Sequence, residues 1–128
     1  MKIINFMPIV IVAMIFYSCA GVNTIRNGKG NGEVRTFNVN YDNAWVYSKK
    51  IFIESGIKVE EELPESGTLI GSTAGNGSYL GVWVEKAGEN TVKLTVYSRR
   101  ALATTLYAGF TAEDFFKKFD AYVRSESR

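Results

Sequence analysis

The chain has 128 residues, of which 46% are hydrophobic and 22% are charged, and its formal net charge is +2. This composition is that of an ordinary folded domain and excludes a disordered or collagen-like chain. The small net charge gives no strong field to attract nucleic acid, and the chain has no histidine and one cysteine. The usual ligands of zinc and haem are therefore missing, and we expect no metal, no cofactor and no nucleic-acid partner.

An apolar stretch over residues 3–17 follows Lys2 at the N-terminus. Its length is that of a signal-peptide core and falls short of the roughly 20 residues that span a bilayer. At its end, Ser18 and Cys19 are small residues that leave a peptidase an extended, unobstructed site. This boundary resembles the lipobox of bacterial lipoproteins, in which the cysteine becomes the first residue and is acylated. The resemblance implies a signal peptide over residues 1–18 and lipid attachment at Cys19.

Two other interpretations of this boundary stay open, because Phe16 stands where the lipobox usually has an aliphatic residue. An ordinary signal peptidase would cut after Ala20, or the apolar segment would stay as an uncleaved anchor. All three interpretations export the rest of the chain. We expect a lipid anchor in the cell envelope. By resemblance to lipoprotein sorting, Ala20 is compatible with the outer membrane, facing the periplasm.

Residues 19–32 are rich in glycine and asparagine and contain few apolar side chains. Such a segment buries too little apolar surface to order itself, so we expect a flexible tether. The tether would let the folded domain, residues 33–128, stand clear of the membrane and search for a partner.

The domain is predicted to follow the order β-α-β-β-β-β-α. A short strand starts near Glu33, and apolar residues then recur at helical spacing over residues 42–55. Asn40 and Asp42 are good N-caps for this helix, and Gly56 suits its left-handed C-cap. Alternating patterns bounded by turn residues predict four more strands, over residues 57–62, 68–73, 79–85 and 91–98.

The last helix is predicted from Thr111, which has the spacing of a capping box with Asp114. In the two strands before it, one parity is entirely aliphatic, with Leu80, Val82, Val84, Val92, Leu94 and Val96. An antiparallel sheet that is covered on one side alternates in this way, so we expect this face to pack against both helices. The predicted fold class is therefore α+β, an antiparallel sheet with two helices packed on one face.

The opposite parity carries Tyr79, Trp83, Lys93 and Tyr97, which form a candidate partner-binding patch. The alternative is that this face is covered, either by the apolar segment 99–110 or by a second subunit. That segment follows neither period well, and it is predicted as a strand extension or a hydrophobic loop. An open edge strand is a further candidate docking site, by strand addition.

An aromatic helix start, a glycine-capped strand and short hairpin turns succeed one another along the domain. They are Tyr41-Asp42-Asn43-Ala44-Trp45, Ser55-Gly56-Ile57-Lys58-Val59, Asn76-Gly77 and Gly88-Glu89-Asn90-Thr91, followed by the helix from Thr111. This arrangement resembles a group of small bacterial lipoproteins. Their domains share a shape with those in the C lipoprotein subunit of the outer-membrane β-barrel assembly machinery. The resemblance covers roughly residues 33–125 and implies an envelope-tethered binding or scaffolding module.

The sequence contains no catalytic constellation. The acidic run Glu60-Glu61-Glu62 lacks the ligand spacing of a calcium loop, and residues 71–77 lack the lysine of a phosphate-binding loop. The serines have no histidine to act as their base. We therefore expect no enzyme activity and no catalytic residue, and a protein that acts by contact with another envelope protein. The alternatives are self-association through the aromatic face, and a lipid or small-molecule carrier with segment 99–110 as its lid.

Overall fold

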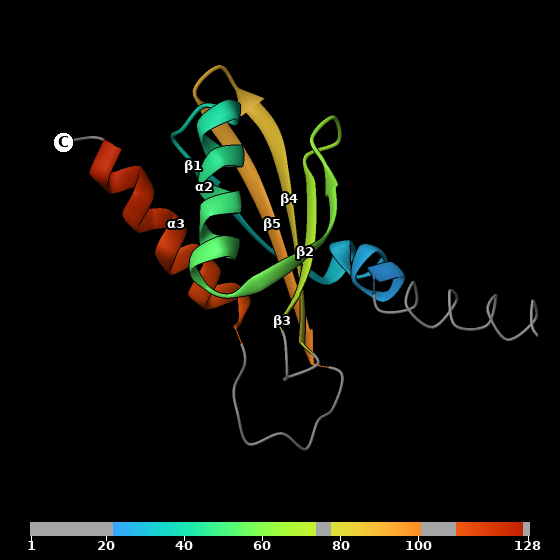
Figure 1. Cartoon of the computed structure of the whole chain (residues 1–128). Coiled ribbons are helices and arrows are strands. Elements are labelled where there is room, and N and C mark those ends of the chain that lie inside the picture. The colour runs from blue at the N-terminus through green and yellow to red at the C-terminus, as the bar shows by residue number, and fades with distance from the viewer. Residues whose placement is uncertain (1–21, 74–77, 101–109, 127–128) are drawn as a thin grey trace, which may run out of the picture.

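The computed structural model of the chain describes residues 22–73, 78–100 and 110–126 (Figure 1). Within these residues, five strands form one antiparallel sheet and two long helices cover one of its faces. The strands are β1 (Glu33–Phe37), β2 (Ile57–Leu63), β3 (Thr68–Thr73), β4 (Ser78–Gly88) and β5 (Thr91–Arg100), and the helices are α2 (Tyr41–Glu54) and α3 (Ala112–Glu126). The predicted order of elements and the placement of both helices on one face are confirmed.

The strand order is β1-β5-β4-β3-β2, so β1 and β2 form the two edges of the sheet. β4 and β5 are longer than predicted, and Arg99 and Arg100 extend β5 as its last residues. The strand-extension interpretation of segment 99–110 therefore holds for its first two residues. Residues 101–109 and the predicted Asn76-Gly77 turn lie outside the described part of the chain.

Local side-chain hydrogen bonds start both long helices where the sequence predicts them. The Asn40 side chain accepts a 2.8 Å hydrogen bond from the Asn43 backbone N–H at the start of α2. At α3, the Thr111 backbone N–H donates to the Asp114 carboxylate at 3.0 Å, and the Asp114 N–H donates back to the Thr111 hydroxyl at 3.3 Å. α2 ends before Gly56, whose φ of +70° is the left-handed conformation that favours glycine.

The core lies between the sheet and the two helices. The six aliphatic residues of β4 and β5 are all buried there, as their shared parity predicts. α3 contributes three buried rings, Phe115, Phe116 and Phe119, and the last lies 4.7 Å from the ring of Phe37 between centroids. Aromatic packing therefore joins α3 to the edge strand β1 as well as to the centre of the sheet.

The turn between β2 and β3 is fixed by contacts to two other elements. The Tyr41 hydroxyl donates to the Pro64 carbonyl at 2.8 Å, and the Val84 backbone N–H donates to the Gly67 carbonyl at 2.8 Å. Gly67 has a φ of +68°, and a Cβ there would overlap the carbonyl oxygen of Val84. Only glycine therefore fits this position, for reasons of both conformation and space.

We predict that Gly67→Ala destabilises the fold more than Gly56→Ala does. Both residues have positive φ, but a Cβ at Gly56 meets no atom within 4 Å. Gly56→Ala should cost about 1–2 kcal/mol, the penalty of the left-handed conformation alone. Gly67→Ala adds the overlap with Val84 to that penalty. Urea unfolding midpoints measure the difference, and equal midpoints for the two variants would contradict the close approach at Gly67.

The seam between α2 and α3 is held by tyrosines and glutamates. The rings of Tyr47 and Tyr122 stack 5.2 Å apart between centroids, and the Tyr122 hydroxyl donates to the Glu54 carboxylate. Burial, followed by a hydrogen bond to Glu126, raises the pKa of Tyr47 to about 12. The Glu126 carboxylate also accepts from the Asn43 side-chain amide at 2.6 Å, so it joins the two helices.

We predict that the free energy of unfolding falls between pH 10 and pH 12 because of Tyr47. The folded state holds this phenol proton more tightly than the unfolded chain, whose tyrosine pKa is 10.0. The stability it contributes is complete below pH 10 and is lost as pH rises through about 12. Tyr47→Phe cannot ionise and should show a shallower loss in urea titrations over this range. Equal slopes for the variant and the natural chain would refute this origin, since lysine titration is common to both.

Candidate functional site

The aromatic face predicted as a binding patch is covered by the N-terminal segment. Residues 22–27 are helical, the short helix η1 (Lys29–Asn31) follows, and both lie on the face opposite α2 and α3 (Figure 1). Ile25 is 1% exposed and forms a second apolar cluster with Ile70 and Trp83. This cover is neither of the two that the sequence suggested, segment 99–110 and a second subunit.

The prediction of a flexible tether is therefore wrong for residues 22–32. A Cβ at Gly28 would overlap the ring of Tyr97, and a Cβ at Gly32 would lie 2.7 Å from the Thr95 methyl group. These glycines thus allow close packing on the sheet, whereas composition alone indicates chain flexibility. Ion pairs from Arg26 to Glu61 and from Lys29 to Glu85 flank the contact.

The four residues of the candidate patch share one face but do not form an open surface. Trp83 is 3% exposed, and Tyr79 and Tyr97 are half-buried against the same cluster. Lys93 is exposed, and its ammonium lies 3.5 Å from the Glu85 carboxylate. Cys19, the candidate lipid-attachment residue, lies outside the described residues.

The Glu85 carboxylate of β4 forms ion pairs with Lys29 of η1 and Lys93 of β5. The Lys29 ammonium lies 2.8 Å from its carboxylate. The hydrogen bond from Lys29 is the main cause that lowers the pKa of Glu85, with a smaller contribution from Lys93. Lys93 therefore shares its carboxylate partner with Lys29 of the N-terminal segment.

The three consecutive glutamates of β2, Glu60 to Glu62, all form hydrogen bonds or ion pairs with neighbouring side chains. Glu60 accepts from the Ser72 hydroxyl at 2.7 Å, Glu62 lies 2.7 Å from the Lys49 ammonium, and Glu61 pairs with Arg26. Among residues 22–73, 78–100 and 110–126, no group of three or more acidic or cysteine side chains is placed to hold a metal ion.

A groove of about 420 Å³ lies beside the β2–β3 turn and includes Tyr41, Ser66 and Lys86 in its lining. The Ser66 hydroxyl lies 3.0 Å from the Thr68 hydroxyl and 3.4 Å from the Leu63 carbonyl. Neither neighbour is a general base, so Ser66 has no partner that would activate it as a nucleophile.

The open part of the sheet is its β1 edge. Glu33, Val34, Arg35 and Thr36 are all exposed, and Val34 is 53% exposed. Because β1 pairs only with β5, alternate residues of β1 direct their backbone N–H and C=O groups away from the sheet. β1 is therefore a template for another strand.

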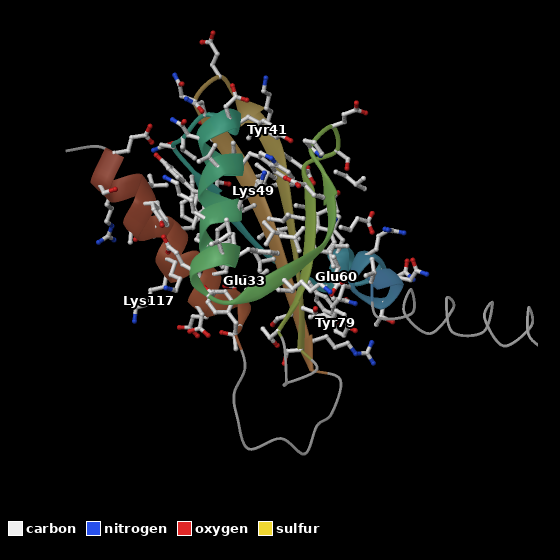
Figure 2. All side chains as sticks on the ribbon, viewed as in Figure 1. Glu33, Tyr41, Lys49, Glu60, Tyr79 and Lys117 are labelled. Carbon is white, nitrogen blue, oxygen red and sulfur yellow. The ribbon has the colours of Figure 1, made fainter. Side chains whose placement is uncertain are left out.

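A groove of about 500 Å³ runs between this edge and α3, and we call it the β1–α3 groove. Its lining includes Arg35 and Phe37 of β1 and Glu113, Phe116 and Lys117 of α3. The Arg35 guanidinium lies 4.4 Å above the centre of the Phe116 ring and 2.8 Å from the Glu33 carboxylate. Figure 2 shows Glu33 and Lys117 as labelled side chains of these two elements. The β1 edge and this groove together form a candidate docking surface of mixed charge.

The comparisons with known proteins add no relative. No protein-family model matches the chain, and no curated protein sequence matches it.

Among the helices of the described residues, none is both long enough and apolar enough to span a bilayer.

We predict that Ile25→Asp exposes Trp83 to water, because Ile25 is the buried centre of the N-terminal cover. In a Trp45→Phe background, Trp83 is the single tryptophan, and its emission should shift to longer wavelength. Asn27→Asp is the matched control, since Asn27 is exposed on the same helix and the substitution adds the same charge. Identical emission spectra for the two variants would show that Ile25 does not hold the cover in place.

Proposed function

We propose that this chain is a lipid-anchored protein of the bacterial cell envelope that acts as a non-enzymatic binding or scaffolding module. The observation that carries the proposal is the position of its single cysteine. Cys19 ends an apolar stretch of signal-peptide length, and an ordered helix packed on the sheet covers residues 22–27. Acylation at Cys19 would therefore join the lipid directly to the folded domain.

The ordered N-terminal segment changes what the anchor would do. A residue spans at most about 3.6 Å, so Val22 would lie within roughly 11 Å of an acylated Cys19. The domain would be held close to the membrane with its N-terminal segment toward the lipid, instead of searching on a long tether. Such confinement raises the effective concentration of a partner in the same membrane.

The proposed mode of action is protein contact through the β1 edge and the β1–α3 groove. Strand addition to an open edge gains affinity from backbone hydrogen bonds and specificity from side-chain pockets beside the edge. β1 offers both features, since its outer backbone groups are open and Arg35 and Phe37 line the adjoining groove. A carrier function gains no support from the core, because phenylalanine rings of α2 and α3 fill the space against the sheet.

We predict that Cys19→Ala moves the protein from the membrane fraction to the soluble fraction and abolishes labelling with palmitate. The unfolding midpoint of the domain should stay unchanged, because Cys19 precedes the described fold. Fractionation, metabolic labelling and intact mass spectrometry measure these effects in cells that express the natural chain or the variant.

The same measurements separate the three interpretations of the N-terminus. An acylated mass beginning at Cys19 supports the lipid anchor. An unlabelled chain that starts after Ala20 indicates an ordinary signal peptidase. A natural chain that retains residues 1–18 and takes up no palmitate indicates an uncleaved anchor. Either of the last two outcomes overturns the proposal of lipidation.

A further inference from the structure

We propose that the β1 edge pairs with β1 of a second copy of this chain, antiparallel, about a two-fold axis at Val34. This inference names the partner of the docking surface proposed above, so it rests on that surface and not on the lipid anchor. The pairing would extend two sheets into one across the dimer, with the same patch used by both copies.

The charges of β1 are complementary to themselves in this register. A two-fold axis at Val34 places Glu33 of each copy opposite Arg35 of the other. Both side chains lie on the same face of the strand and are exposed, with 46% and 45% of their side-chain surface accessible. The register therefore forms a group of four alternating charges, and a register centred on Arg35 would instead bring two arginines together.

Val34 supplies the apolar contact at the axis. It is one of the exposed large hydrophobic side chains of the described residues, at 53%. In the proposed register each Val34 lies directly opposite its own copy, at the distance of a cross-strand pair. The pair therefore covers part of the Val34 surface that is exposed in the single chain.

Arg35 is already positioned for the contact. Its guanidinium is held over the Phe116 ring at 4.4 Å and bonds Glu33 through Nε at 3.2 Å and Nη2 at 2.8 Å. An arginine has five N–H donors in a planar fork, so donors remain for a second carboxylate. The Arg35 side chain is therefore already ordered in the single chain, so it loses less conformational entropy when a partner binds.

The other edge, β2, also exposes apolar residues, Val59 and Leu63, but it differs from β1 in two respects. β2 carries three consecutive glutamates and has a register irregularity between Val59 and Glu61. Like charges placed opposite one another repel, and a bulge interrupts strand pairing, whereas the β1 charges are of opposite sign. Self-pairing is consequently expected at β1 and not at β2.

Within β1, this register pairs three residues of each copy, Glu33, Val34 and Arg35. Phe37 would stand opposite residue 31 of the second copy, which belongs to η1. The two Phe37 residues are then about six residues, or about 20 Å, apart along the strand direction.

Disulfide trapping tests the register in the full-length chain in its own membrane. Val34→Cys should give an oxidised dimer, because directly opposed residues lie within reach of a disulfide. Thr36→Cys is the matched control on the same exposed strand. Its two copies would be about four residues, or roughly 14 Å, apart, which exceeds the disulfide limit of about 7 Å. The natural chain controls for Cys19.

Charge exchange between two chains tests the pairing itself. In the Val34→Cys background, Glu33→Arg and Arg35→Glu should each lower the trapped dimer by about tenfold, because attractive pairs become repulsive. Two differently tagged chains, one with each substitution, should form a trapped heterodimer when expressed together. That rescue occurs only between chains, so an effect on the internal Glu33–Arg35 pair cannot produce it.

Each outcome decides the inference. A Val34→Cys dimer with heterodimer rescue supports it, and equal trapping of Thr36→Cys overturns the register. Trapping of Val34→Cys to a protein of another mass overturns self-pairing while the proposed docking surface stands. Failure of Val34→Cys to form a dimer, with an unchanged unfolding midpoint, rejects the pairing, whereas the proposed docking surface stands because a disulfide adduct needs a cysteine in the partner.

Discussion

The alternation of side chains along the central strands is the constraint on which the rest of this structure depends. Val82 and Leu94 belong to the aliphatic core under α2 and α3, whereas Trp83 lies on the opposite face with Ile70. Both faces at the centre of the sheet are therefore apolar, and water is an unfavourable neighbour for each. The two long helices cover one face. The short N-terminal segment packs on the other face and buries Ile25 against Ile70 and Trp83. This packing is favourable because that face is itself apolar.

Covering both faces directs any protein contact to the edges of the sheet. β2 is bent by a register irregularity and carries glutamates that pair with Arg26, Lys49 and Ser72 of neighbouring elements. β1 has no comparable protection on its outer side, and its backbone groups stay available. The two edge strands also differ in how they join the sheet. β1, the first strand, pairs with the last strand β5, whereas β2 pairs with β3, the next strand along the chain. Of the two edges, β1 is therefore the one at which we expect the sheet to extend.

Local chemistry made much of this fold predictable from the sequence. Asn40, Asp114 and Gly56 act at helix ends through contacts within a few residues, and the aliphatic parity of β4 and β5 needs only neighbouring positions. The N-terminal cover was not predictable in this way. Its glycines match the shapes of Tyr97 and Thr95, which lie far along the chain, so composition alone indicates flexibility. The sequence indicated that an open edge strand could dock a partner but not which strand, because the pairing of β1 with β5 is non-local and decides which strands form the edges.

The N-terminal cover links the proposed anchor to the proposed pairing. A strand of five residues forms few backbone hydrogen bonds, so edge pairing between freely diffusing domains would be weak. Confinement to a membrane would remove one dimension of diffusion, and a lipid on Cys19, three residues before Val22, would also limit the orientations of the domain. Both effects would reduce the entropy that association must overcome, without any new contact at the edge. A flexible tether would give the first effect alone. The close packing of Gly28 and Ile25 on the sheet would therefore serve association as well as stability, because it fixes how β1 is presented within the membrane plane.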